Sequence, residues 1–421
     1  MIEIRSAAEL LAKWTPQSRP PLVIIGANAF QRPLVRRANA LGYETHVFAW
    51  REGAVAAAEA AFYYPISIVD TEAILACCER IRPVGITTVG SDLAMLTAGA
   101  LARRLGLPAN SERCSYIASN KYAMREAFAR CGVRVPAHHK VCGAQYRALS
   151  EGRRQAFCRR LLSGTESLIV KPTDRSGSRS IFRIDPAETA LSDCLRQLDQ
   201  ALRQAMRDSF ESAAIVEAFI EGAEFSCETI SERGEHHVLQ ITEKITTAAP
   251  HYIEVAHVQP ATLNDGQRAE IQREVLKGLD ALEISQGASH AEFRLDREGK
   301  AHIIEIGARM GGDFIGSHLV PLSTGYDYLG LTLAAATGRP LELQAASHAA
   351  YSAVRFAFTA SDLNVLKTFC SRFPDVVKEQ YFSQEIHPVM DSSSRLGHVV
   401  VGTNSEETLT ALLQDIPNVG K

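Results

Sequence analysis

The first third of the chain alternates between buried-strand and helical patterns. Residues 21–30, PLVIIGANAF, form an apolar run that ends in a tight turn. Residues 31–42, QRPLVRRANALG, have helical spacing and lead into a second apolar run at 43–50. A strand, a helix and a strand within about thirty residues are typical of a βαβ unit. The pattern repeats to residue 107 and predicts an α/β domain with a doubly wound parallel sheet over residues 1–115.

The pattern is interrupted after this domain. Pro108 and Asn110 break the preceding helix, and Ser119 or Asn120 is positioned to cap a new helix that starts near Lys121. We therefore expect a domain boundary in this segment.

Short strands separated by turns dominate from about residue 135 onward. Two long helical segments, at 187–208 and 264–284, interrupt them. This mixture is typical of an α+β body, which we predict over residues 116–345.

The last segment begins with the alternating sequence AAYSAVRFAFTA. A second alternating stretch, GHVVVGT, and a short helical stretch, SEETLTALLQDI, follow. The pattern predicts a small α+β cap over residues 346–421.

Composition and charge exclude several classes of protein. Hydrophobic residues make up 46% and charged residues 22% of the 421, and the formal charge is -3. The sequence contains no basic tract interleaved with aromatic residues, so it does not support nucleic-acid binding. No apolar run approaches the roughly 20 residues of a membrane span, and Glu3, Arg5 and Glu9 are unlike a signal peptide. The nine cysteines show no CxxC pair or zinc spacing. We expect a cytoplasmic protein.

The first strand-to-helix turn argues against a dinucleotide site. Its sequence, Gly26-Ala27-Asn28, lacks the GxGxxG pattern that lets a pyrophosphate approach the backbone. A Rossmann oxidoreductase is therefore disfavoured, and we expect the turn to receive a small substrate.

A candidate phosphate-binding segment is SLIVKPTDRSGSRSIFRI. Lys171 ends an apolar strand, and the loop at 173–180 supplies hydroxyl groups, backbone N–H groups and arginines. These groups suit phosphate oxygens. An ordinary hairpin with Ser and Gly in its turn is the alternative.

A candidate purine-binding segment is AAIVEAFIEGAEFSCETI. A bound purine nucleotide needs apolar walls, polar backbone groups and an acid for its ribose hydroxyls. These groups could come from Glu217, the backbone of Phe219 and Ile220, and Glu224. A hairpin with solvated acids is the alternative.

The segment HAEFRLDREGKAHIIEIGARMGGD places two acids on two paired strands. Glu292 and Glu305 are each set among apolar residues, and strict alternation would put Glu305 on the same face as Ile303. Adjacent buried carboxylates repel each other, and Mg²⁺ relieves this repulsion with one or two carboxylates and substrate phosphates as ligands. A surface hairpin with outward acids is the alternative.

The order of these motifs resembles the ATP-grasp enzymes. It comprises Lys121 at a helix start, Lys171 in VKP, EAFIEGAEF, HAEF and IIEIGARMGGD, and it covers nearly the whole chain. The greatest likeness is to carboxylate–amine ligases of the L-amino-acid (dipeptide-forming) type. It implies a pre-grasp domain, a central grasp domain with a nucleotide-binding subdomain at about 135–222, and a C-terminal cap.

The resemblance also implies functional roles for particular residues. ATP phosphates would contact Lys121 and Lys171, under a loop that includes Ser176, Gly177 and Ser178. The adenine hinge would run from Glu217 through Phe219 to Ile220, with Glu224 on the ribose and Mg²⁺ (or Mn²⁺) on Glu292 and Glu305. Substrates would contact Glu254, His257, Arg309, Gly311 and Gly312, with Arg309 and Lys171 in catalytic roles.

Two positions leave questions open. Many ATP-grasp enzymes have an asparagine two residues after the second metal glutamate, where this chain has Gly307, so the number of metals is open. Asp92 could contact a substrate ammonium group or cap the following helix, and the residues themselves favour capping.

The resemblance implies an ADP-forming enzyme that joins a small-molecule carboxylate to an amine, and a homodimer would be common for such a fold. An ATP-dependent carboxylase that uses bicarbonate is one alternative. A non-catalytic ATP-binding module is another, although two lysines and two acids argue against it.

Overall fold

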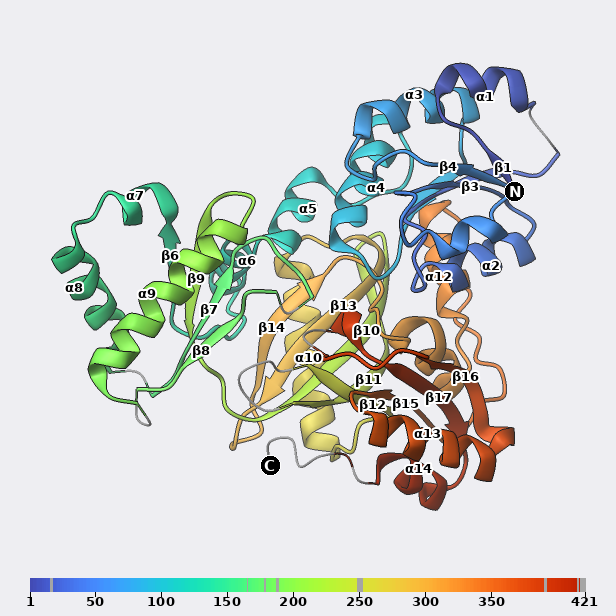
Figure 1. Ribbon diagram of the computed structural model, residues 1–421. Coiled ribbons are helices and arrows are strands. Elements are labelled where there is room, and N and C mark those ends of the chain that lie inside the picture. Colours follow the sequence, from blue (N-terminus) through green and yellow to red (C-terminus); the bar gives the residue numbers. More distant parts are fainter. Residues whose placement is uncertain are drawn as a thin grey trace.

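The computed structural model describes residues 1–15, 18–164, 166–177, 179–186, 189–247, 253–389, 392–414 and 416. Three parts of the chain can be followed in Figure 1: a blue N-terminal domain, a green subdomain and a large body coloured from yellow-green to red. Both smaller parts border the large body.

The N-terminal domain is built on one five-stranded sheet in the order β1-β4-β3-β2-β5, and every pairing is parallel. Residues 22–25 are fully buried, as a strand covered on both faces requires. The predicted doubly wound sheet is confirmed. Its elements are β1 (Ile2–Glu3), α1 (Ala7–Lys13), β2 (Pro21–Ile25), α2 (Arg32–Ala40), β3 (Glu44–Phe48), β4 (Phe62–Tyr64), α3 (Thr71–Ile81), β5 (Gly85–Thr87) and α4 (Asp92–Arg104).

The green subdomain is a four-stranded antiparallel sheet in the order β6-β9-β7-β8. Helix α9 packs on it through an apolar face that includes Leu198 and Leu202, both fully buried. It is joined to the N-terminal domain through α5 (Glu112–Ser119) and α6 (Lys121–Arg130). Its elements are β6 (His138–Cys142), α7 (Gly143–Arg147), α8 (Glu151–Leu162), β7 (Leu168–Pro172), β8 (Phe182–Ile184), α9 (Leu191–Asp208) and β9 (Ala213–Ala218).

The large body contains an eight-stranded antiparallel sheet in the order β14-β13-β10-β11-β12-β15-β17-β16. Helix α10 packs on β14, α12 packs on β13 and β10, and α13 and α14 pack on β15. Its elements are β10 (Ala223–Glu232), β11 (Glu235–Thr246), β12 (Glu254–Gln259), α10 (Asp265–Ala281), β13 (Gln286–Leu295), β14 (Ala301–Gly307), α11 (Val320–Thr324), α12 (Tyr328–Ala336), β15 (Tyr351–Ala357), α13 (Ala360–Arg372), β16 (Val377–Phe382), β17 (Gly397–Thr403) and α14 (Glu406–Leu413).

The C-terminal segment contributes its strands to this same sheet. Strand β15 pairs with β12, and β17 pairs with β15, both antiparallel. The sheet therefore runs without a break across residue 345, and the side chains of the last segment can reach a site formed by earlier strands.

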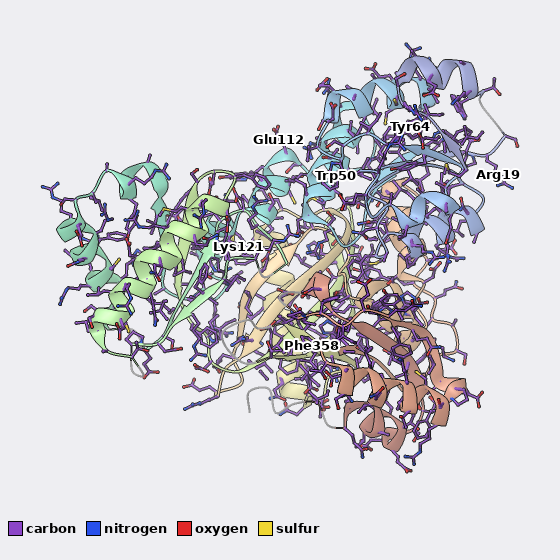
Figure 2. The ribbon with its side chains drawn as sticks, viewed as in Figure 1. Arg19, Trp50, Tyr64, Glu112, Lys121 and Phe358 are labelled. Carbon is purple, nitrogen blue, oxygen red and sulfur yellow. The ribbon has the colours of Figure 1, made fainter. Side chains whose placement is uncertain are left out.

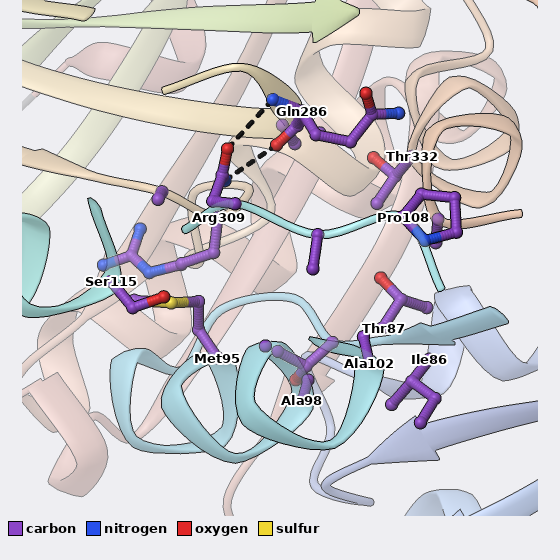
Figure 3. A pocket seen from close by; sticks show the side chains of 18 residues that line it. Ile86, Thr87, Met95, Ala98, Ala102, Pro108, Ser115, Gln286, Arg309 and Thr332 are labelled. Carbon is purple, nitrogen blue, oxygen red and sulfur yellow. Dashed lines mark hydrogen bonds between the residues drawn. The ribbon is translucent and has the colours of Figure 1, made fainter. Parts of the chain in front are cut away.

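Asn110 joins the N-terminal domain to the large body. Its Oδ1 accepts hydrogen bonds from the backbone N–H groups of Ser285 and Gln286, both at 2.9 Å, and its Nδ2 donates to Gln286 O. A small cavity of about 90 Å³, which Arg309 also lines, lies beside this contact (Figure 3). The segment predicted as a boundary thus holds the start of β13 through Asn110.

Among the described residues, no helix combines the length and the apolar character that crossing a membrane requires.

Candidate active site

One cavity of about 810 Å³ lies where the three parts of the chain meet. Two of the predicted site residues, Phe219 and Gly311, are not among its lining residues, and Ser178 lies outside the described residues. The predicted residues that line it are Asp92, Lys121, Lys171, Ser176, Gly177, Glu217, Ile220, Glu224, Glu254, His257, Glu292, Glu305, Arg309 and Gly312.

Lys121 lies between the green subdomain and the eight-stranded sheet, which we call the central sheet (Figure 2). It is the first residue of α6, and Asn120 Oδ1 accepts from Ala123 N at 3.0 Å, so the predicted cap is confirmed. Lys121 Nζ donates to Arg175 O at 2.6 Å and lies 3.0 Å from Glu305 Oε2. This ammonium group therefore links the loop after β7 to β14.

Lys171 and Glu217 form an ion pair on neighbouring strands of the green subdomain, with 3.2 Å between Nζ and Oε2. Arg125 Nε also donates to Glu217 Oε1, at 2.5 Å. Burial acts to raise the pKa of Glu217, but the charges of Arg125 and then Lys171 outweigh it and lower the pKa to about 2. The Glu217 carboxylate, predicted to contact adenine, is thus committed to two cations.

The segment predicted as an adenine hinge is partly used by the fold itself. Phe219 N donates to Ser167 O at 3.0 Å, and Arg294 Nη1 donates to Ile220 O at 3.1 Å. The Phe219 ring lies 4.0 Å from the Arg183 guanidinium carbon and 4.7 Å from that of Arg294. Glu217, Ala218 and Ile220 are the residues of this hinge that line the cavity.

Glu292 and Glu305 are directly opposed on β13 and β14, so the predicted pairing of the two acids is confirmed. The predicted phase of β14 is wrong, because the pairing register shifts after Glu292 and skips Ile304. As a result, Ile303 and Ile306 are both fully buried in the apolar core, whereas Ile304 and Glu305 line the cavity. A bulge of one residue changes which side chains share a face.

Lys244 on β11 lies among the carboxylates of Glu224, Glu254 and Glu292. The sequence analysis did not identify this lysine as a site residue. Its Nζ lies 2.7 Å from Glu292, 2.9 Å from Glu224 and 3.7 Å from Glu254. Burial acts to lower the pKa of Lys244, but attraction to these carboxylates, Glu292 first, raises it well above its ordinary value. The available signal was one lysine within the apolar strand LQITEKIT.

His290 is a second cation beside the acid pair. Its Nδ1 contacts the Glu228 carboxylate, and its Nε2 lies 3.3 Å from Glu292 Oε1. Burial acts to lower the pKa of His290, but the charge of Glu228 outweighs it and raises the pKa to about 9. Gly311 N donates to the other oxygen of Glu228 at 3.1 Å. Gly311, which was predicted to contact the substrate, therefore helps to hold the carboxylate that contacts His290.

Arg309 and Asp92 form a bidentate ion pair at 2.8 and 3.2 Å. The favoured capping role of Asp92 is wrong: Ser91 is the N-cap of α4, and its Oγ accepts from Ala94 N. Burial acts to raise the pKa of Asp92, but Arg309 outweighs it and lowers the pKa. Asp92 thus faces the cavity as an anion.

Arg395 lines the cavity beside Glu254 and Asp313, and we call this part of the cavity its far end. The sequence did not indicate Arg395 as a site residue. Arg395 donates to Asp313 and to Glu254, each at 2.9 Å, and Ser392 Oγ donates to Glu254 at 2.8 Å. This contact could not be predicted from local patterns, because Arg395 lies 141 positions from Glu254.

His257 lies beside this group and is 1% exposed. Its Nε2 is 3.6 Å from Asp313 Oδ2, and neither ring nitrogen has a hydrogen-bond partner among the described residues. Burial is the main cause that lowers the pKa of His257. The imidazole is therefore neutral at pH 7.

Comparison with known proteins identifies the central part of the chain. Residues 165–317 match the family model for the ATP-grasp domain. The chain carries an ATP-grasp domain. The predicted family is thereby confirmed, and the acid pair and both hairpin strands lie within the matched segment.

Solved structures share this fold over nearly the whole chain. The L-amino acid ligase from Bacillus licheniformis has a TM-score of 0.72 at 23% identity, covering 94% of this chain and 96% of that one. The N5-carboxyaminoimidazole synthetase from Staphylococcus aureus, complexed with ADP, has a TM-score of 0.71 at 16% identity, covering 93% and 95%.

In sequence, the chain is similar to the alanine–anticapsin ligase of Bacillus subtilis (strain 168). Identity is 26% over 256 residues, which are 57% of this chain and 51% of that protein. The ligase of the same name from Bacillus amyloliquefaciens matches at 26% over 54% of this chain and 49% of its own length. The chain thus spans about half the length of the curated relatives it matches, and it resembles carboxylate–amine ligases of the ATP-grasp family.

Proposed function

We propose that this protein is an ATP-dependent ligase that activates a carboxylate as an acyl phosphate and couples it to an amine. The products would be an amino-acid or peptide-like amide, ADP and phosphate. The observation that carries the proposal is the opposed pair Glu292 and Glu305, which shares one cavity with Lys121, Lys171 and Arg309. The similarity of the chain to alanine–anticapsin ligase and to L-amino acid ligase supports the choice of an amine as the acceptor.

ATP would lie between the green subdomain and the central sheet. We assign Lys121 and Lys171 to the phosphates as compact positive charges. Because Arg125 and Lys171 already hold the Glu217 carboxylate, we assign Glu217 to positioning Lys171 and not to the adenine. The remaining proposed contacts are Ser176, Gly177 and Ser178 for the phosphates, Ile220 for the adenine and Glu224 for the ribose. Phe219 does not line the cavity and is left out of this assignment.

The two opposed acids fit a divalent cation that is shared with phosphate oxygens. Among the described residues, no three histidine, cysteine, aspartate or glutamate side chains gather to hold a metal. Mg²⁺ commonly needs only one or two carboxylates when phosphates and water complete its shell. In that position it would neutralise charge on the transferred phosphoryl group, and Lys244 and Lys121 would yield contacts that they now make with Glu292 and Glu305.

We assign the catalytic roles to Arg309, Lys121 and Lys171. Lys121 and Lys171 hold the phosphate oxygens in line with the attacking carboxylate oxygen, which is catalysis by positioning and charge. Arg309 stabilises the negative oxygen that develops when the amine attacks the acyl phosphate. Losing one such donor typically costs about 3 kcal/mol of transition-state stabilisation.

The far end of the cavity would hold the substrates. We assign Glu254 at this end, and Asp92 beside Arg309, to an ammonium group, which would share each carboxylate with the arginine that now pairs with it. Gly312 lines the same cavity. His257 is a neutral imidazole whose two nitrogens have no hydrogen-bond partner in the described part of the chain, so it suits a polar group of the substrate.

A phosphate-release screen tests the proposal. The purified protein is incubated with ATP, Mg²⁺ and all pairs of the twenty amino acids, with bicarbonate alone as a separate arm. We expect ADP release that requires both an acid and an amine, with an amide product detectable by mass spectrometry. Release that depends on bicarbonate, or no release with any pair, would overturn the proposal in favour of a carboxylase or a non-catalytic module.

A further inference from the structure

Three rings form a row across the floor of the cavity's far end. They are His257 on β12, Phe356 on β15 and His398 on β17, three strands that lie side by side (Figure 1). Phe356 and His398 are directly opposed, with ring centroids 6.4 Å apart, and His257 lies 6.0 Å from Phe356. All three line the cavity.

Further flat groups surround this row. The Phe314 ring lies 4.3 Å from His398, and the Tyr381 ring lies 6.0 Å from it. The guanidinium carbon of Arg395 lies 3.7 Å from the centroid of the Phe356 ring. A pocket with walls of this kind favours a flat substituent, because rings prefer offset or edge-to-face contact with other rings.

Unpartnered nitrogens give the row a polar edge. Both ring nitrogens of His257 and the Nε2 atom of His398 are buried without a hydrogen-bond partner among the described residues. Burial lowers the pKa of His398 to about 4 and is the main cause that lowers the pKa of His257. Both imidazoles are thus neutral at pH 7, and each offers one donor and one acceptor.

Arg395 cannot serve as a free charge for a substrate carboxylate at this end. Its guanidinium group is already shared between Asp313 and Glu254. Because the charges here are paired and the histidines are neutral, a charged side chain would gain no free counter-ion in the row. An uncharged ring with a hydrogen-bonding edge would satisfy both the flat walls and the unpartnered nitrogens.

We propose that the row of His257, Phe356 and His398 binds the side chain of one of the two substrates, and that this side chain is a flat, uncharged ring with a polar edge, such as the phenol of tyrosine. This inference rests on the proposed ligase function and narrows its substrate class. It predicts that kcat/KM at that substrate position falls in the order tyrosine, phenylalanine, leucine, alanine. We expect tyrosine to exceed phenylalanine by at least about tenfold, because a site with unpaired buried polar groups rejects the analogue that lacks the hydroxyl.

The test compares kcat and KM for these four amino acids in the wild type and in His398→Phe. The variant keeps a ring at the position but loses Nε2, so the ratio of kcat/KM for tyrosine over phenylalanine should fall towards one, mainly through KM. The matched control is His348→Phe, an exposed histidine that does not line the cavity, and its ratio should equal that of the wild type. Thermal unfolding and ATP binding report whether each variant is folded.

A second variant, Phe356→Leu, tests the ring contact, and it carries the test if His398→Phe does not fold. It should lower the preference for phenylalanine over leucine. Turnover of aliphatic pairs without any preference for ring-bearing amino acids would overturn this inference and leave the ligase function standing. Absence of ADP release with every pair would instead overturn the ligase function itself.

Discussion

Arg309 donates hydrogen bonds to both carboxylate oxygens of Asp92, from Nε at 2.8 Å and from Nη2 at 3.2 Å. The two residues are 217 positions apart, one at the start of α4 and the other in the turn after β14. The pair therefore ties the N-terminal domain to the strand that carries Glu305. The orientation of the Arg309 guanidinium group depends on a domain that contributes no residue to the acid pair itself.

Replacing Asp92 tests this dependence. We expect Asp92→Asn to lower the free energy of unfolding by about 2 kcal/mol, because Arg309 loses a charged acceptor in a largely buried setting. ADP release should fall with it, since Arg309 is no longer held. Urea unfolding and phosphate-release assays measure the two effects.

A cap variant provides the control for that experiment. Ser111 caps α5 by accepting from Cys114 N, and it does not line the cavity. Ser111→Ala should cost about 1 kcal/mol of stability and leave turnover unchanged. If Asp92→Asn behaves in the same way, Arg309 does not need Asp92 for its function.

Glu305 is the acid whose loss should most directly affect phosphoryl transfer. Glu305→Gln keeps the shape of the side chain but removes the charge that faces Lys121 and that we propose to bind a divalent cation. We expect ADP formation to fall by about a hundredfold or more, in line with the loss that follows when a metal site is disturbed, while the protein stays folded. A matched control is Glu298→Gln, an exposed acid in the turn of the same hairpin. Equal turnover in both variants would refute the assignment of Glu305 to the metal.

Local pattern was sufficient to predict much of the fold and the pairing of the two acids. The βαβ pattern led to the parallel sheet, and the two short strands around residues 296–300 led to the hairpin that opposes Glu292 and Glu305. The bulge at Ile304 was not predictable, because strict alternation contains no information about an extra residue. That residue decides which isoleucine faces the cavity.

Contacts between distant segments were beyond the reach of sequence patterns. Lys244 bridges three carboxylates from β10, β12 and β13, and Arg395 reaches two acids from the loop before β17. These pairings depend on the order of strands in the eight-stranded sheet, which spacing along the chain does not specify. Lys244 and Arg395 were therefore harder to predict than Glu292 and Glu305, which lie in one recognisable motif.

His290 makes stability depend on pH in the alkaline range. Its pKa is about 9 in the folded protein against an ordinary value of 6.5, so the folded state holds the proton more tightly than the unfolded state. The resulting stabilisation is complete below about pH 6.5 and is lost as the pH rises through 9. Its size is on the order of 3 kcal/mol.

The measurement is the free energy of unfolding in urea from pH 6 to pH 10. The wild type should lose stability above pH 7, and His290→Asn should show a flatter profile over the same range. His348→Asn, at an exposed position, should follow the wild type. A profile for His290→Asn that parallels the wild type would mean that another group titrates.

Two adjacent glycines provide a final contrast that separates packing from binding. A Cβ atom on Gly311 would lie 2.6 Å from His290 Nδ1 and 2.9 Å from Glu228 Oε1, whereas a Cβ atom on Gly312 would meet only Gly90 Cα at 4.0 Å. We expect Gly311→Ala to destabilise the protein by about 2 kcal/mol, because added volume in a packed core forces its neighbours to move. Gly312→Ala should leave the free energy of unfolding nearly unchanged, so any loss of substrate affinity in that variant would come from the cavity that Gly312 lines. Urea unfolding and substrate KM together distinguish the two positions, and equal stability of both variants would show that the Glu228–His290 pair is not packed as tightly as these distances require.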